Sequence, residues 1–286
     1  MRIEPGTRVL ITGGSRGLGL SLAQLLVEQG ARVGVIARSV ADPRSGPLEL
    51  GSGIELIHAD VADLVQLESA IERFRADYGG IDLLVVNAAF ASTGPFIEQS
   101  FEEIDRMVDV NVRGALMTVR FALPSMIEQG RGHVVLTSCM TGVHGMPQVA
   151  TYGATRAAVR GIADGLWHEL DGTGVGVTLA VSAELETGMF AAHAERLPTW
   201  MRPREATDPA RLARAILRAV ERERRILYFP GSDVRLLALF AGLPRLVEFG
   251  LRQTRGVEAA PVRGVASAVA LPPPALPASE LPAGDA

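Results

Sequence analysis

A glycine-rich turn close to the N-terminus carries the clearest chemistry in this sequence of 286 residues. The turn follows an apolar run and precedes a helical pattern, and it reads Thr12-Gly13-Gly14-Ser15-Arg16-Gly17-Leu18-Gly19. Its glycines permit a tight turn and let backbone N–H groups approach a pyrophosphate, while the start of the following helix adds partial positive charge. The pattern therefore predicts a dinucleotide-binding site formed by Thr12, Gly13, Ser15, Arg16, Gly17, Leu18 and Gly19.

Further motifs follow this turn in a fixed order: Asp60-Val61, Asn87-Ala88-Ala89, Asn111, Tyr152 with an arginine four residues later, and Thr187. Together with the turn they make the chain resemble the classical short-chain dehydrogenase/reductase family over residues 7 to 230. The resemblance implies an oxidoreductase that transfers a hydride between a nicotinamide cofactor and a carbonyl or secondary alcohol. It also implies that Asp60 and Val61 contact the adenine, that Asn87 belongs to the cofactor site, and that Thr187 contacts the nicotinamide amide.

Two arginines favour NADP(H) over NAD(H) as the cofactor. An acidic residue at the end of the second expected strand would bind a ribose 2′-hydroxyl and repel a 2′-phosphate, but this chain has Ala37-Arg38-Ser39 there. Arg38 and Arg16 instead place two permanent positive charges where a 2′-phosphate would lie. The alternative interpretation is that both arginines are solvated surface charges.

The family resemblance implies that Tyr152 is the acid/base of the reaction and that Arg156 is its electrostatic partner. The sequence contains no lysine, and Arg156 stands where the family has one. Residues four apart on a helix share a face, so the guanidinium can approach the phenol and lower its pKa. Its planar head is bulkier than an ammonium and cannot adopt the same geometry.

Cys139 stands thirteen residues before Tyr152, where the family has a serine, and Ser138 precedes it. Neighbouring side chains on a strand face opposite sides, so the two cannot both point into the site unless the strand has ended. Either Ser138 or Cys139 is expected to polarise the substrate carbonyl, and a thiol is the weaker donor. Asn111 is expected to position water or backbone.

Two other residues could support acid/base chemistry without hydride transfer. His144 lies on a loop that lines the substrate site in the family, and Glu184 would lie near the nicotinamide. Either could act as a general acid or base. The alternatives are therefore a non-redox isomerase, cyclase or lyase on the same fold, and a cofactor-bound regulatory or scaffold protein. The other histidines show no metal-ligand spacing, so no metal site is expected.

Short β-branched runs alternate with helical patterns along the chain, which predicts an α/β fold. We expect a Rossmann-like, doubly wound parallel sheet of seven strands in a three-layer α/β/α arrangement. The expected strands are 8–12, 32–37, 54–58, 83–87, 133–138, 176–181 and 225–229, and the expected helices are 18–29, 63–78, 101–128, 151–170 and 208–223.

Residues 1–255 are expected to form a single domain. Within it, the proline-punctuated segment 184–207 is expected to be a lid or substrate loop. An apolar helix over 234–253 would pack on the core or on a partner subunit, or else form a substrate wall or touch a membrane surface. The proline-rich segment 256–286 is expected to be a disordered tail.

Composition limits the partners. With 28 basic and 32 acidic residues the net charge is −4, which gives no reason to expect nucleic acid as a partner. No segment is apolar enough for a transmembrane span. The single cysteine excludes an internal disulfide, and no leader is recognisable, so a cytoplasmic protein is expected. The substrate is expected to be a small, mostly apolar molecule. Helices 101–128 and 151–170 are expected to pair in a homodimer or homotetramer.

Overall fold

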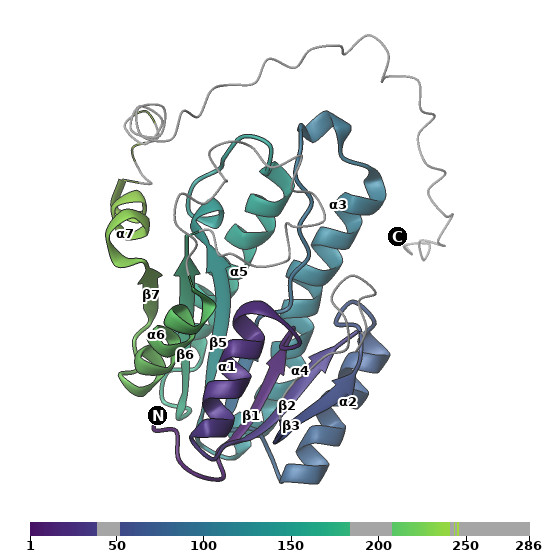
Figure 1. The fold of residues 1–286 in the computed structure, drawn as a ribbon, viewed down its shortest axis with the longest axis vertical. Helices are drawn as coiled ribbons and strands as arrows, with labels where there is room; N and C mark the ends of the chain where they lie inside the picture. Colours follow the sequence, from purple (N-terminus) through teal and green to yellow (C-terminus); the bar gives the residue numbers. More distant parts are fainter. Residues whose placement is uncertain (39–51, 184–207, 241–242, 244, 246–286) are drawn as a thin grey trace, which may run out of the picture.

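The structure, a computed structural model of the whole chain, describes residues 1–38, 52–183, 208–240, 243 and 245. Within them, seven strands form one parallel sheet, ordered β3-β2-β1-β4-β5-β6-β7 (Figure 1). The strands are β1 (Arg8–Thr12), β2 (Arg32–Ala37), β3 (Ile54–His58), β4 (Leu83–Val86), β5 (Gly132–Cys139), β6 (Val175–Ser182) and β7 (Ile226–Phe229). This arrangement confirms the predicted doubly wound α/β fold.

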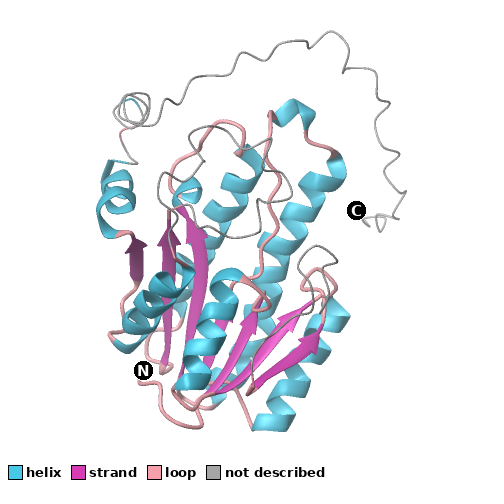
Figure 2. Ribbon diagram, viewed as in Figure 1, coloured by secondary structure: helices cyan, strands magenta, loops and turns pink. Residues whose placement is uncertain are grey.

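Helices cover both faces of the sheet (Figure 2). They are α1 (Gly17–Glu28), α2 (Leu64–Tyr78), α3 (Phe101–Val108), α4 (Gly114–Glu128), α5 (Ala150–Glu169), α6 (Pro209–Glu221) and α7 (Gly231–Phe240). Two short 3-10 turns, η1 (Phe96–Glu98) and η3 (Met140–Gly142), precede α3 and follow β5. Helices α1 and α6 share one apolar core with the sheet, while α2, α4 and α5 share the core on the opposite face.

Strand β4 shows how both cores are built. Leu84 and Val86 belong to the core under α2, α4 and α5, and Leu83 and Val85 belong to the core under α1 and α6. All four side chains are buried. A strand of a parallel sheet is covered on both faces, which is why it is a continuous apolar run without alternation.

The structure shifts several expected boundaries. Strand β4 ends at Val86, one residue earlier than expected. Strands β5 and β6 are each one residue longer at both ends, because they pair from Gly132 opposite Val175 to Cys139 opposite Ser182. The single helix expected over 101–128 is interrupted by a π-helical turn, η2 (Asp109–Arg113), between α3 and α4. This wider turn carries Asn111, whose side chain is fully buried.

Local capping signals explain where two of the helices begin. The Asp63 side chain accepts hydrogen bonds from the N–H groups of Val65 and Gln66 at the start of α2. At the start of α3, Ser100 and Glu103 form a reciprocal capping box. Each pattern satisfies N–H groups that lack a partner within the helix, so both helix starts are encoded locally.

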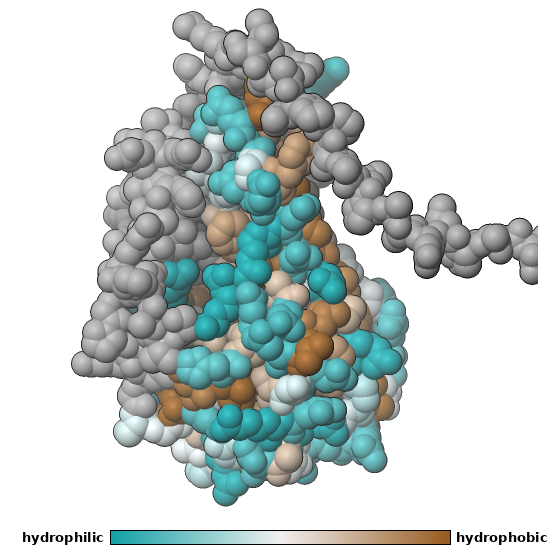
Figure 3. Space-filling view, turned by 90° about the vertical axis from the view of Figure 1, so that its right-hand side faces the viewer, coloured by the Kyte–Doolittle hydropathy of each residue, from teal (hydrophilic) through white to brown (hydrophobic). Residues whose placement is uncertain are grey.

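Large apolar side chains remain exposed along α3 and α4, namely Phe101, Val108, Leu116 and Ile127. The side of the molecule seen in Figure 3 shows apolar patches among hydrophilic surface. Within the described part of the chain, no helix is long and apolar enough to cross a membrane. The expected segments 184–207 and 256–286 lie outside the described residues, as does most of 241–253.

Candidate active site

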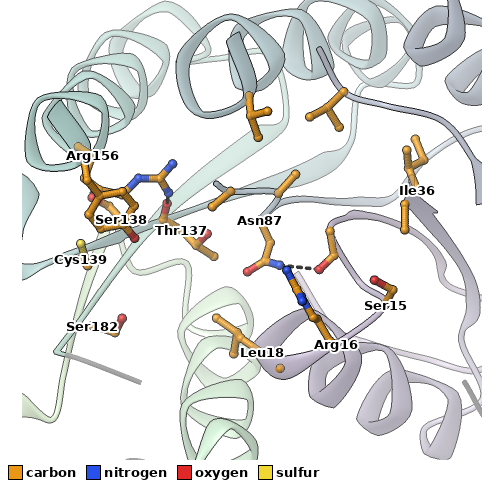
Figure 4. Close-up of a pocket in the computed structure, with 18 of the residues that line it drawn as sticks. Ser15, Arg16, Leu18, Ile36, Asn87, Thr137, Ser138, Cys139, Arg156 and Ser182 are labelled. Atoms are coloured by element: carbon orange, nitrogen blue, oxygen red, sulfur yellow. Dashed lines mark hydrogen bonds between the residues drawn. The ribbon is translucent and has the colours of Figure 1, made fainter. Parts of the chain in front are cut away.

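A cleft lies at the carboxyl ends of the strands, where β1 and β4 lead into opposite halves of the sheet (Figure 4). Ligands of doubly wound sheets bind at this position. Most of the residues expected to bind the cofactor line the cleft: Gly13, Ser15, Arg16, Gly17, Leu18, Arg38, Asp60, Val61 and Asn87. Four residues expected at the reacting end also line it: Ser138, Cys139, Tyr152 and Arg156.

The glycine turn is held in a shape that only glycine allows. Gly13 has a left-handed backbone with φ 69°, and a Cβ there would lie 2.6 Å from the Cα of Ala88. A Cβ on Gly19 would overlap the carbonyl oxygen of Gly13. The turn thus brings α1 directly against the loop after β4 and leaves backbone facing the cleft.

Hydrogen bonds made by the side chains of Thr12 and Asn87 hold the backbone of this turn in place. Thr12 Oγ1 accepts hydrogen bonds from the N–H groups of Asn87 at 3.2 Å and Ala88 at 3.3 Å. The Asn87 amide donates to the carbonyl oxygen of Gly13 at 2.8 Å (Figure 4). Thr12 and Gly19 therefore shape the turn without lining the cleft.

Positive charge gathers at the end of the cleft beyond β2. Arg16 and Arg38 line it, and Arg106 from α3 joins them through an ion pair with Asp60, with 2.6 Å between Nη2 and Oδ2. Burial lowers the pKa of Arg38, and the positive charges of Arg106 and Arg16 lower it further against the opposing effect of Asp60. Sequence reasoning missed Arg106, because it lies 46 residues from its partner and belongs to no motif.

Asp60 is fixed by contacts within the protein. Its Oδ1 accepts a hydrogen bond from the N–H of Ala62 at 3.0 Å, and its Oδ2 pairs with Arg106. Burial raises the pKa of this carboxyl, but the Ala62 hydrogen bond and the nearby guanidinium groups lower it more, so the net shift is downward. Asp60 is therefore ionised at neutral pH and offsets the positive charge of Arg106, with which it is paired.

Helix α5 supplies Tyr152 and Arg156 to the other end of the cleft. Figure 4 shows Arg156 there, close to Ser138 and Thr137. Their exposed fractions are 6% and 3%, and the guanidinium carbon lies 5.3 Å from the centre of the phenol ring. Arg156 Nη1 donates to the carbonyl oxygen of Thr137 at 3.3 Å. Its Nε and Nη2 are buried without a hydrogen-bond partner in the described part of the chain.

The neighbours of the Tyr152 phenol shift its pKa in opposite directions. Burial raises its pKa most strongly, and the neighbouring Cys139 raises it further. The positive charge of Arg156 acts in the opposite direction. The net shift is upward, so the phenol holds its proton at neutral pH.

The side chains of Ser138 and Cys139 make different contacts. The Ser138 hydroxyl donates to the backbone carbonyl of Arg156 at 2.9 Å, which ties β5 to α5. The Cys139 sulfur lies 2.9 Å from the Oγ1 of Thr141. Cys139 lines the same cleft as Tyr152 and is close enough to raise the pKa of its phenol.

Asn111 holds backbone in place and does not line the cleft. Its Oδ1 accepts from the N–H of Phe90 at 2.8 Å, and its Nδ2 donates to the Phe90 carbonyl at 2.8 Å and to Thr155 Oγ1 at 3.0 Å. Thr155 in turn donates to the carbonyl of Tyr152 at 2.7 Å. The buried amide thus connects the loop after β4 to the turn of α5 that carries Tyr152.

Three further residues singled out from the sequence are not among the described cleft lining. His144 is half-buried and is not part of the cleft lining. Glu184 and Thr187 lie outside the described residues. Among residues with described positions, no cluster of three His, Cys, Asp or Glu side chains could hold a metal ion.

Known proteins share this sequence pattern. Residues 7–197 match the family model of the short chain dehydrogenases. An uncharacterized oxidoreductase of Staphylococcus aureus strain MW2 is 31% identical over 212 residues, covering 74% of this chain and 89% of that protein. Oxidoreductase asL5 of Sarocladium schorii is 29% identical over 182 residues, covering 64% of this chain and 73% of that protein.

Solved structures share the fold. A short-chain dehydrogenase from Streptomyces avermitilis superposes with a TM-score of 0.72 at 28% identity and covers 90% of this chain and 100% of its own. One from Burkholderia cenocepacia J2315 in complex with NADP has a TM-score of 0.72 at 24% identity, covering 87% and 98%. Another from Burkholderia phymatum in complex with NAD has a TM-score of 0.73 at 21% identity, covering 91% and 99%.

Proposed function

Because the chain belongs to the short-chain dehydrogenase family, we propose that it uses NADP(H) to interconvert a carbonyl and a secondary alcohol on a mostly apolar small molecule. Both NADP and NAD occur in solved structures of this fold, so the cofactor must be inferred from the charges of this chain. The observation that carries the proposal is the group of Arg16, Arg38 and Arg106 at one end of the cleft, where Asp60 pairs with Arg106.

This charge cluster favours a phosphate. Asp60 is paired with Arg106, and among the described residues the positive charges of Arg106 and Arg16 both act on Arg38 against the negative charge of Asp60. The fall in the pKa of Arg38 reflects burial and like-charge repulsion, both of which a bound anion would offset. Arginine donates in a planar fork that fits phosphate oxygens. A ribose 2′-phosphate at this end of the cleft supplies that anion, and its absence in NAD(H) leaves the repulsion in place.

The rest of the cleft fits a dinucleotide. The glycine turn presents backbone that no Cβ obstructs, at the N-terminus of α1, where a pyrophosphate is favoured. At the opposite end, Nε and Nη2 of Arg156 are buried donors without partners among the described residues, and ribose hydroxyls are acceptors they could bind. Met140 and Ala183 line the cleft near Tyr152, which suits an apolar substrate.

The roles of the reacting side chains follow from this placement. When bound, the nicotinamide supplies a hydride for reduction or accepts one in oxidation. In reduction the Tyr152 hydroxyl gives its proton to the carbonyl oxygen, and in oxidation the phenolate takes that proton back. Burial and Cys139 keep the phenol protonated, while Arg156 stabilises the phenolate that remains after transfer.

The alternative reactions gain no support from the site. A non-redox isomerase, cyclase or lyase would use Tyr152, His144 or Glu184 as its acid or base. His144 does not line the cleft, and Glu184 lies outside the described residues. The oxidoreductase therefore remains the one proposed function.

Titration of the protein with NADPH and NADH tests the cofactor. We expect tighter binding of NADPH, and we expect Arg38→Gln to weaken NADPH binding about 10- to 100-fold, because one charge-assisted hydrogen bond is lost. Binding of NADH should change much less. Arg120→Gln, an exposed arginine on α4, is the matched control and should alter neither affinity. Equal losses for both cofactors in Arg38→Gln, or tighter binding of NADH by the unmodified protein, would contradict NADP(H) preference.

A further inference from the structure

The cleft contains a hydroxyl that no sequence motif singles out, that of Thr141. It lies in the short turn η3 directly after β5 and is buried, with 4% of its surface exposed. Thr141 lines the same cleft as Cys139 and Tyr152. Its Oγ1 lies 2.9 Å from the Cys139 sulfur. The phenol, the thiol and the hydroxyl therefore all belong to the reacting end of one cleft.

The three candidate donors beside Tyr152 differ in what they can offer a carbonyl oxygen. A thiol is a weak donor. The Ser138 hydroxyl is already engaged, because it donates to the carbonyl of Arg156. The Thr141 hydroxyl has the Cys139 thiol as its partner, and the hydrogen between them can belong to either atom. When the thiol donates to Thr141 Oγ1, the hydroxyl hydrogen is left for an acceptor in the cleft, since a hydroxyl can accept and donate at once.

Close packing fixes Thr141 relative to the catalytic helix. A Cβ on Gly153 would lie 2.9 Å from the carbonyl oxygen of Thr141, and a Cβ on Gly142 would lie 2.6 Å from the carbonyl carbon of Arg156. Turn η3 therefore rests directly on α5, backbone against backbone, over the segment that carries Tyr152. A donor held this rigidly needs no reorganisation when charge develops on the substrate oxygen.

We propose that Thr141 is a catalytic residue that donates a hydrogen bond to the substrate oxygen beside Tyr152, and that the Cys139 thiol orients its hydroxyl. This inference rests on the proposed function. In the reduction described above, the carbonyl double bond becomes a carbon–oxygen single bond, and the proton that ends on the alcohol oxygen comes from Tyr152. Thr141 keeps its own proton throughout and stabilises the negative charge that develops on that oxygen.

Paired substitutions test the assignment, with NADPH oxidation measured on benzaldehyde, acetophenone and cyclohexanone. Thr141→Val keeps the side-chain shape and removes the hydroxyl, and we expect it to lower kcat/KM about 10²- to 10³-fold. Thr141→Ser retains the hydroxyl and should stay within severalfold of the unmodified protein. Cys139→Ala should lose about tenfold or less. Thr118→Val removes an equally buried threonine hydroxyl on α4, away from the cleft, and should leave kcat/KM unchanged.

Two readouts separate this proposal from a structural effect. The dissociation constant of NADPH should be the same in the unmodified protein and in Thr141→Val. Alkylation of the single cysteine by iodoacetamide, measured without cofactor, should change severalfold in Thr141→Val and be restored in Thr141→Ser, because the thiol loses and regains its partner. Thr141→Ala replaces Thr141→Val if the latter does not fold.

The outcomes are distinct. Full activity in Thr141→Val together with a large loss in Cys139→Ala would assign the donor role to the thiol and overturn the proposal. If iodoacetamide alkylates Cys139 at the same rate in Thr141→Val and in the unmodified protein, the contact between Thr141 and Cys139 is wrong, and the proposal that depends on it is overturned. If the unmodified protein binds NADPH but oxidises it with none of the three carbonyls, the proposed function itself fails and this inference falls with it.

Discussion

Replacing Arg156 with methionine is expected to stabilise the protein without cofactor and to abolish most of the extra stability that NADPH provides. The Arg156 side chain is 3% exposed, and its Nε and Nη2 have no hydrogen-bond partner among the described residues. Each unsatisfied buried polar group costs about 1–3 kcal/mol, so the two together cost about 2–6 kcal/mol. Methionine fills similar space and leaves no donor unsatisfied.

Two favourable contacts are lost in the same substitution. The contact of the guanidinium with the Tyr152 ring, at 5.3 Å, contributes about 0.5–2 kcal/mol. The 3.3 Å hydrogen bond to the Thr137 carbonyl contributes about 1 kcal/mol. The midpoint of the relieved cost, about 4 kcal/mol, exceeds the midpoint of the lost contacts, about 2 kcal/mol, so the expected net rise in the free energy of unfolding is about 2 kcal/mol. This corresponds to a Tm several degrees higher for a chain of this size.

Urea unfolding with and without NADPH measures both effects. At a concentration of about 100 times Kd, NADPH should stabilise the unmodified protein by about 2.7 kcal/mol and Arg156→Met by much less. Arg73→Met is the control: this arginine is 59% exposed, so the free energy of unfolding should stay within about 0.5 kcal/mol. If Arg156→Met is the less stable protein without NADPH, or gains as much from NADPH as the unmodified chain, the reasoning about the unpaired donors is wrong.

Two further predictions concern the rest of the molecule. Burial lowers the pKa of His133 to about 4, below the value of about 6.5 in an unfolded chain, so its contribution to stability is full above pH ~6.5 and about 3 kcal/mol is lost as pH falls toward 4. His133→Gln should flatten this part of the pH profile in urea unfolding, and an unchanged slope would assign the acid sensitivity elsewhere. The exposed apolar side chains of α3 and α4 support the expected homodimer or homotetramer. Light scattering should show this assembly at micromolar concentration and a shift toward monomer in Leu116→Arg, whereas a monomeric unmodified protein would contradict it.

The fold was readable from the sequence because its signals are local. Each buried strand is a short apolar run, and Asp63 and Ser100 mark the starts of helices through contacts within a few residues. The contacts that shape the glycine turn are equally local, since Gly13 and Gly19 lie only six residues apart and their backbones are in contact. Strand ends were less predictable. The last pair of β5 and β6, Cys139 opposite Ser182, depends on how far two strands stay in register.

The site beyond the glycine turn depends on tertiary packing, which the sequence does not display. Arg106 on α3 meets Asp60, which lies two residues after β3, only through the tertiary fold. The interpretation of Ser138 and Cys139 from strand alternation left the donor open, and the structure shows the Ser138 hydroxyl bound to the Arg156 carbonyl. Thr141 had no motif to draw attention to it, because its position beside the thiol follows from the turn η3.

The central claim, that this chain reduces carbonyls with NADPH through Tyr152, is tested most directly by NADPH oxidation in the unmodified protein and in Tyr152→Phe. The phenylalanine variant keeps the ring beside Arg156 and removes the proton that the reaction needs. We predict oxidation of NADPH by the unmodified protein with an apolar aldehyde or ketone, and a loss of about 10²- to 10⁴-fold in Tyr152→Phe at unchanged NADPH affinity. Equal rates in the two proteins would remove Tyr152 from the mechanism and contradict the account.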